Sequence, residues 1–354
     1  MAELVDQPKK VREGEELDGP KLEAYLKSKV PGLEGTMRVA QFPGGASNLT
    51  YSVAFDNADL VLRRPPFGKK PKSGHDMKRE ATVMQRLHPH YPTPEVVLFC
   101  DDPEVMGCDF FVMRRIRGII FRKDVPKELA FGPEKARELA YSVIDELIRL
   151  HQLDYQAIGL ADLGHPEGYV KRQVDGWIGR YEAARTPDAA DFRGVMEWLR
   201  AKMPAESGAS IVHNDFRIDN CIMDPADPTK VIGVLDWEMA TIGDPLMDLG
   251  NTLTYWIQAD DPPAFQMVRA QPTHLPGMPT RDELVQHYAA KTGRTIDSFE
   301  WYLAWGCFRL AVIVQQIYYR FFHGQTKDER FRSFVHFGAL LEQAALGYQK
   351  RAGG

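Results

Sequence analysis

The chain has 354 residues, of which 44% are hydrophobic and 26% are charged, a balance typical of a globular protein with a large core. Its net charge of -5 argues against a general nucleic-acid binder, and its four scattered cysteines argue against a zinc site or a disulfide framework. The charged first eighteen residues and the lack of an apolar run long enough to cross a bilayer predict a cytoplasmic protein with no membrane partner.

The first part of the chain predicts a small sheet. Residues 39–55 contain two strand-like segments joined by a glycine-rich stretch that includes Gly44, Gly45 and Ser47. Glycines let a backbone approach a phosphate closely, and Ser47 adds a hydrogen-bond donor. The same stretch is also compatible with an ordinary hairpin turn.

A third strand and a helix follow. Residues 60–65 alternate, so that Arg63 shares a face with Val61 and Arg64 points to the other face. The amphipathic segment 76–87 predicts a helix that carries Glu80, which on pattern alone is compatible with a surface position.

Helices dominate the second part of the chain. Strands at 96–100 and 109–116 complete the sheet, and we place a boundary between two lobes near Arg117. Helical periodicity then predicts helices at 133–151, 168–185, 195–203, 283–291, 299–322 and 331–349. The proline-rich insert between 258 and 281 is too irregular for a core element and is typical of a lid or a binding segment.

The central hairpin contains the candidate chemistry. A polar loop with Asp215 and Asn220 precedes a short strand, and a second strand delivers Asp236 at its end. Carboxylate and amide oxygens suit Mg²⁺, and phosphoryl transfer uses one Asp for the attacking hydroxyl and an Asn and a second Asp for the metal. The alternative is that these side chains only cap turns.

Three motifs in this region carry a family resemblance. HNDFRIDN at 213–220, LDWE at 235–238 and GDPLMDLG at 243–250 resemble the aminoglycoside phosphotransferase family of small-molecule kinases. They are most similar to the branch with the kinase-like domain fused to some acyl-CoA dehydrogenases. The resemblance implies an α+β, bilobal, protein-kinase-like fold that binds ATP and Mg²⁺. Its small antiparallel-sheet nucleotide-binding lobe would span 1–117, and its larger, mainly helical catalytic lobe would span 118–354.

The resemblance also implies roles for single residues. Asp215 would be the catalytic base, whereas Asn220 and Asp236 would hold the metal. Arg63, positioned by Glu80, would steady the nucleotide phosphates. Gly44, Gly45 and Ser47 would belong to the loop that covers the nucleotide.

The chain departs from the protein-kinase pattern at two of these positions. Arg63 stands where that pattern has lysine, and Glu238 stands where it has glycine, which leaves open whether Glu238 is a metal ligand. His151 and His213 are expected to be structural, and Asp248 is expected to cap a helix or anchor the catalytic loop.

We therefore predict a small-molecule kinase that transfers phosphate from ATP to a hydroxyl group. The acceptor is left open among an antibiotic, an amino alcohol, a sugar and a hydroxyacyl-CoA, with the resemblance slightly favouring the last. Two rivals remain, a regulatory pseudokinase that binds nucleotide and a phosphate-ester hydrolase with the same acids and metal. Oligomeric state and the choice between ATP and GTP are not predicted.

Overall fold

The computed structural model describes residues 4–43, 48–67 and 76–353, and the chain divides into two compact units. The first unit comprises residues 1–120, 158–160 and 220–240, and the second comprises 121–157, 161–219 and 241–354. The first thus combines the N-terminal part of the chain with the hairpin 220–240, a segment that the sequence-based boundary near Arg117 assigns to the second lobe.

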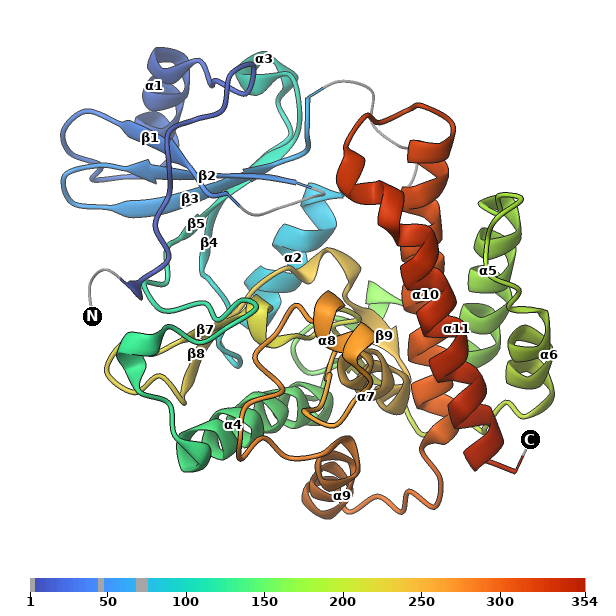
Figure 1. Ribbon diagram of the computed structural model, residues 1–354. Coiled ribbons are helices and arrows are strands. Elements are labelled where there is room, and N and C mark those ends of the chain that lie inside the picture. The colour runs from blue at the N-terminus through green and yellow to red at the C-terminus, as the bar shows by residue number, and fades with distance from the viewer. Residues whose placement is uncertain (1–3, 44–47, 68–75, 354) are drawn as a thin grey trace. The chain divides into compact units, whose positions relative to one another are not determined.

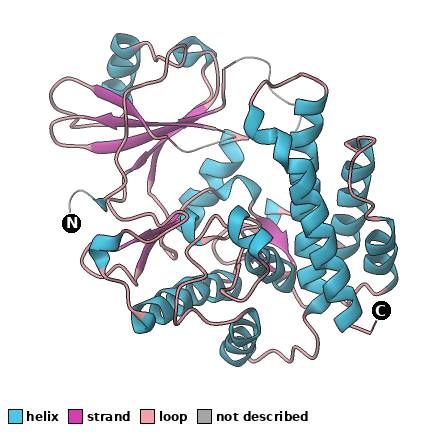
Figure 2. Ribbon diagram, in the orientation of Figure 1, coloured by secondary structure: helices cyan, strands magenta, loops and turns pink. Residues whose placement is uncertain are grey.

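The first unit is built on an antiparallel five-stranded sheet with the order β1-β2-β3-β5-β4 (Figures 1 and 2). The strands of this sheet are β1 Arg38–Gln41, β2 Leu49–Ala54, β3 Asp59–Arg64, β4 Val96–Cys100 and β5 Phe110–Arg114. Its helices are α1 Gly19–Lys29, α2 Met77–Leu87 and α3 Pro103–Met106. A short hairpin of β7 Cys221–Met223 and β8 Val231–Val234, followed by the 3-10 turn η5 Trp237–Met239, completes the unit.

Alternation along the strands divides this sheet into two faces. Leu60 and Leu62 of β3 join a buried core with Leu22 and Leu26 of α1, whereas α2 packs against β4 and β5. Arg63 therefore lies on the opposite side of β3 from the α1 core, as the period of two predicts.

The second unit is mainly helical. Its α-helices are α4 Pro133–Gln152, α5 Tyr169–Ala183, α6 Arg193–Ala201, α7 Pro245–Thr254, α8 Pro263–Val268, α9 Arg281–Thr292, α10 Glu300–Phe322 and α11 Phe334–Arg351. Its short 3-10 segments are η2 Lys127–Leu129, η3 Ala161–Leu163 and η6 Glu329–Ser333, and η4 Ile218–Asn220 ends at the first residue of the segment 220–240 of the first unit. A two-stranded ladder joins β6 Ser210–Val212 to β9 Thr241–Gly243, a pairing that the sequence did not predict.

Helix α10 is the centre of this second unit. It packs against α5, α7 and α11, and Figure 1 shows α10 and α11 running side by side. Gly250 of α7 and Gly306 of α10 permit the close α7–α10 contact, because a Cβ atom on Gly250 would lie 2.6 Å from the Tyr302 carbonyl oxygen. Among the described residues no helix is both long enough and apolar enough to cross a membrane.

The insert between 258 and 281 contributes buried residues, contrary to the expectation that it is too irregular for a core element. It contains helix α8 and three buried polar side chains, Arg269, Gln271 and Thr273. Each bonds to backbone groups elsewhere in the second unit; the Gln271 Oε1 atom, for example, accepts the Ile218 N–H at 2.7 Å. Polar side chains can be buried when they satisfy backbone groups in this way, which hydropathy alone does not reveal.

Candidate functional site

A cluster of charges in the first unit is centred on Arg63. Its Nη2 atom lies 2.5 Å from Asp236 Oδ1 and 3.6 Å from Glu238 Oε2. Its Nε atom lies 3.1 Å from Glu80 Oε2, close enough for an ion pair, although the two groups are not aligned as a hydrogen bond. The ion pair between Arg63 and Glu80 that the sequence predicts is therefore present, and Arg63 also contacts two acids from the hairpin segment.

Local structure places Glu80 toward this cluster. Asp76 caps α2 by accepting the Arg79 N–H at 2.9 Å, which fixes the first turn in which Glu80 lies. The Arg79 side chain in turn donates to the Ala240 carbonyl oxygen at 2.9 Å, and α2 packs against η5. Only 1% of the Glu80 side chain is exposed.

Burial is the main reason why the pKa of Glu80 is raised to about 7. The negative charges of Asp236 and Glu238 raise it further, whereas the Arg63 charge and the Trp237 backbone N–H lower it. Glu238 is also held by the Asn48 side chain, which donates to Glu238 Oε2 at 2.8 Å. The sequence left the role of Glu238 open, and here the residue links Arg63 to Asn48.

The hairpin brings Asn220 and Asp236 to the same end of β7 and β8. The Leu235 N–H donates to the Asn220 carbonyl oxygen at 2.9 Å, which joins the residue before β7 to the residue after β8. Asp236 has φ 70° and ψ 58°, a left-handed conformation that few residues other than glycine adopt. The Trp237 side chain fixes this bend, because its Nε1 donates to the Val234 carbonyl oxygen at 3.0 Å and its ring packs edge-on against Tyr91.

In the second unit, Asp248 anchors the loop that carries Asp215. Its Oδ2 atom accepts the His213 N–H at 2.7 Å, and its Oδ1 atom accepts the Asn214 N–H at 2.7 Å. His151 Nε2 lies 3.1 Å from the same carboxylate, so the expected anchoring role of Asp248 and the structural role of His151 are confirmed. Burial alone would raise the pKa of Asp248, but its hydrogen bonds from His151 and the backbone hold it below the usual range.

Asp215 follows a residue in an unusual backbone conformation. Asn214 has φ 64°, and its side chain lies 3.4 Å from the Tyr169 hydroxyl and 3.3 Å from Asn251 Nδ2. The Asp215 N–H donates to His213 Nδ1 at 3.2 Å, which confirms that His213 supports the loop. Backbone strain held by several side chains is characteristic of functional loops.

Basic and aromatic side chains surround Asp215 within the second unit. The Arg217 Nε atom lies 3.5 Å from Asp215 Oδ1 and 3.3 Å from Asp219 Oδ1, and the Arg217 guanidinium lies 4.8 Å from the Tyr255 ring centroid. Burial and the charge of Asp215 raise the pKa of Tyr255 to about 12, so this phenol is protonated at neutral pH. Sequence reasoning did not single out Arg217, although its place between two acids in HNDFRIDN was a usable signal.

The remaining sites predicted from the sequence stand as follows. Gly44, Gly45 and Ser47 lie outside the described residues. Arg63, Glu80, Asn220 and Asp236 all belong to the first unit, whereas Asp215 belongs to the second.

The profile of the phosphotransferase enzyme family matches residues 38–284, which include the Arg63 cluster and the loop of Asp215. The chain belongs to this phosphotransferase family. Its curated relatives include mouse acyl-CoA dehydrogenase family member 10, which is 34% identical over 316 residues, or 87% of this chain. Human acyl-CoA dehydrogenase family member 11 is 31% identical over 360 residues, or 99% of this chain. The chain spans only 29% and 44% of the length of these two proteins.

Solved structures share the fold of this chain. A Ralstonia eutropha protein named as a candidate aminoglycoside phosphotransferase superposes with a TM-score of 0.81 at 29% identity, covering 95% of this chain and 99% of that one. Choline kinase from Cryptosporidium parvum superposes with a TM-score of 0.63 at 13% identity, covering 94% and 96% of the two chains. The aminoglycoside phosphotransferase APH(4)-Ia, solved with ADP and hygromycin B, gives a TM-score of 0.60 at 14% identity and covers 94% and 99%. The predicted kinase-like α+β fold of this phosphotransferase family member is thereby confirmed.

Proposed function

We propose that the chain is an ATP- and Mg²⁺-dependent small-molecule kinase that transfers the γ-phosphate to a hydroxyl group of its acceptor. The observation that carries this proposal is the Arg63 cluster, in which a buried acid holds a cation beside Asp236 in a member of the phosphotransferase family. A guanidinium can bind phosphate oxygens through two parallel hydrogen bonds, so Arg63 is suited to the nucleotide phosphates.

The donor set near Asp236 fits a magnesium ion. Asn220 and Asp236 supply an amide oxygen and a carboxylate oxygen from adjacent ends of one hairpin, and Mg²⁺ takes its other ligands from water and phosphates. A bound ion would neutralise charge on the phosphates. No group of three or more His, Cys, Asp or Glu side chains in the described part of the chain is placed to hold a metal.

Asp215 is proposed to accept the proton of the acceptor hydroxyl. Its loop is held by Asp248 and His213, which would keep the carboxylate in one orientation, and Arg217 lies 3.5 Å from it. Positioning of this kind, together with neutralisation of charge, supplies most of the rate enhancement in phosphoryl transfer.

A hydroxylated acyl-CoA is the acceptor that we favour. The two relatives described above are acyl-CoA dehydrogenase family members, and an acyl-CoA carries phosphates that would be attracted to arginine. Arg217 lies beside Asp215, with its Nε atom 3.5 Å from Asp215 Oδ1.

The test is a screen for ATP consumption with Mg²⁺ over 4-hydroxyacyl-CoA, aminoglycosides, amino alcohols and sugars, with Asp215→Asn as the matched control. We expect turnover with the acyl-CoA, and a decrease in kcat by a factor of about 10²–10⁴ in the variant. Turnover only with an aminoglycoside would refute the favoured acceptor. Turnover that does not require a nucleotide would indicate a phosphate-ester hydrolase.

One observation favours a second candidate, a regulatory protein that binds nucleotide without transferring phosphate. Arg63 Nη2 is 2.5 Å from Asp236 Oδ1, so the arginine pairs with the proposed metal ligand. Two results together would support this alternative over the kinase. Calorimetry would show that ATP binds with an affinity that Asp215→Asn does not change, and no acceptor would give turnover.

A further inference from the structure

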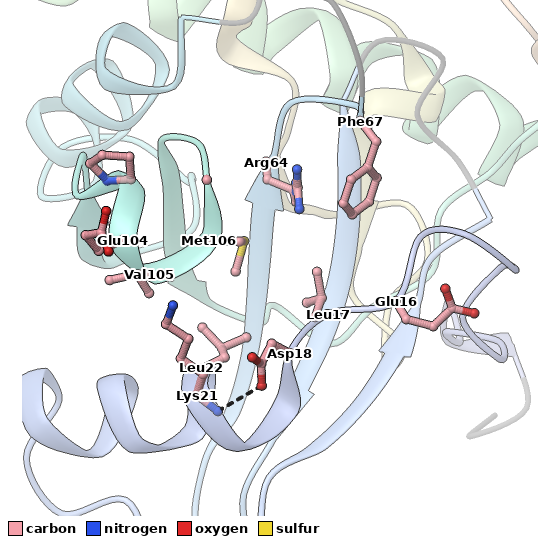
Figure 3. A pocket seen from close by; sticks show the side chains of 12 residues that line it. Glu16, Leu17, Asp18, Lys21, Leu22, Arg64, Phe67, Glu104, Val105 and Met106 are labelled. Atoms are coloured by element: carbon pink, nitrogen blue, oxygen red, sulfur yellow. Dashed lines mark hydrogen bonds between the residues drawn. The ribbon is translucent and has the colours of Figure 1, made fainter.

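A pocket of about 450 Å³ lies in the first unit, on the α1 side of the sheet (Figure 3). It is lined by the start of α1, the end of β3, and α3. Leu17, Leu22, Val105 and Met106 supply apolar side chains to a mixed lining that also contains charged ones. Its volume falls within the range of about 300–1,000 Å³ that is typical of small-molecule sites.

Arg64 is the distinctive polar group of this pocket. Its exposed fraction is 5%, and its Nε atom donates to the Pro65 carbonyl oxygen at 3.1 Å. The Phe67 ring centroid lies 3.8 Å from its guanidinium carbon, and Figure 3 shows the two side chains next to each other. No carboxylate among the described residues forms an ion pair with Arg64, whereas Arg63 on the other face of β3 contacts three acids. A buried guanidinium without a carboxylate partner is costly, and an anionic ligand would remove that cost.

The charges around the pocket limit the kind of anion that it can hold. Two basic side chains, Lys21 and Arg64, and three acidic side chains, Glu16, Asp18 and Glu104, line the pocket. Asp18 caps α1 by accepting the Lys21 N–H at 3.2 Å, so its carboxylate is fixed at the pocket. Three acids would repel a phosphate dianion or a nucleotide more strongly than a single carboxylate.

We propose that this pocket binds a small amphipathic monocarboxylate, such as a medium-chain fatty acid. The carboxylate pairs with the terminal nitrogens of Arg64, whose planar fork matches the two carboxylate oxygens. The apolar body lies along Leu22, Val105 and Met106. The site uses the face of β3 opposite Arg63, so it is distinct from the proposed phosphotransfer site and does not depend on it.

Titration calorimetry of the full chain with octanoate tests this proposal. We expect octanoate to bind, and octanol to bind at least about tenfold more weakly, since a hydrogen-bonded charge pair contributes that much. Inorganic phosphate should also bind at least about tenfold more weakly, because it has no apolar body and meets three acidic side chains. Arg64→Gln should weaken octanoate by a similar factor. Hydrogen exchange should show protection by octanoate at 18–22 and 103–107.

Two further variants make the result decisive. Met106→Glu adds a negative charge to a half-buried wall of the pocket and should weaken octanoate even if Arg64→Gln fails to fold. Arg114→Gln on neighbouring β5 removes an exposed arginine outside the pocket and should leave octanoate binding unchanged. The proposal is overturned if octanoate does not bind, if neither pocket variant that folds weakens it, or if octanol or phosphate binds as tightly.

Discussion

Removal of the Arg63 guanidinium is the most direct test of the electrostatics in the first unit. The Arg63 side chain is 13% exposed and that of Glu80 is 1% exposed, so Arg63→Met leaves a buried carboxylate without its nearest cation. Breaking a buried ion pair from one side costs about 3–5 kcal/mol, and we expect the free energy of unfolding to fall by that amount at pH 8. Urea denaturation without nucleotide or metal measures it. Arg114→Met is the matched control, because its pair with Glu95 is 59% and 46% exposed and should cost at most about 1 kcal/mol.

The pH dependence of this loss follows from Glu80. Its pKa in the folded protein is raised to about 7, first by burial. A raised carboxyl pKa means that the folded state holds the proton more tightly than the unfolded chain, so this group stabilises the protein at low pH and loses that effect as pH rises through about 7. Arg63 lowers this pKa, so its removal raises it further. The cost of Arg63→Met should therefore be largest near pH 8–9 and smaller near about pH 5–6.

A double-mutant cycle isolates the pair itself. Glu80→Gln removes the buried charge, so Arg63→Met should cost about 1–3 kcal/mol less in that background than in the wild type. The reasoning is refuted if the two costs agree within about 0.5 kcal/mol, or if the cost in the wild type does not change with pH.

Three further predictions concern the second unit. Asp248→Asn should lower the free energy of unfolding in urea by about 3 kcal/mol at pH 7. Because the pKa of Asp248 is lowered in the folded state, the difference between the variant and the wild type should shrink only below about pH 3.9. A difference that stays constant down to about pH 3 would contradict the anchoring role of Asp248. Gly250→Ala should destabilise the protein by about 1–3 kcal/mol because the new Cβ would lie 2.6 Å from the Tyr302 carbonyl oxygen. The control Gly347→Ala on α11 places its Cβ in open space and should stabilise the protein by about 0.5–1 kcal/mol. Equal shifts in Tm for the two variants would refute the packing argument. Gln271→Met should lower the free energy of unfolding by about 1–3 kcal/mol and speed hydrogen exchange at the Ile218 amide, because it removes the acceptor of the Ile218 N–H. An unchanged exchange rate would show that this hydrogen bond does not hold the loop of Asp215.

Local pattern was enough to predict most of the elements and the candidate acids. Alternation on β3 placed Arg63 and Arg64 on opposite faces, and helical periodicity located α2, α4 and α10, because both signals depend only on neighbouring residues. The spacing of Asp215, Asn220 and Asp236 likewise pointed to one type of chemistry. The nucleotide and metal roles of these residues stay predictions, as does the lobe boundary near Arg117.

Contacts between distant segments were decided only by the tertiary structure. Arg63 meets Asp236 across 173 positions of sequence, and Asn48 meets Glu238 across 190, separations at which no periodic pattern carries information. The burial of Gln271 depends on one backbone N–H of the Asp215 loop, and the pocket beside Arg64 depends on how α1 and α3 cover the end of β3. Sequence determines which chemical groups are available and which face of an element they share, whereas packing decides which of them become partners and which polar groups are buried.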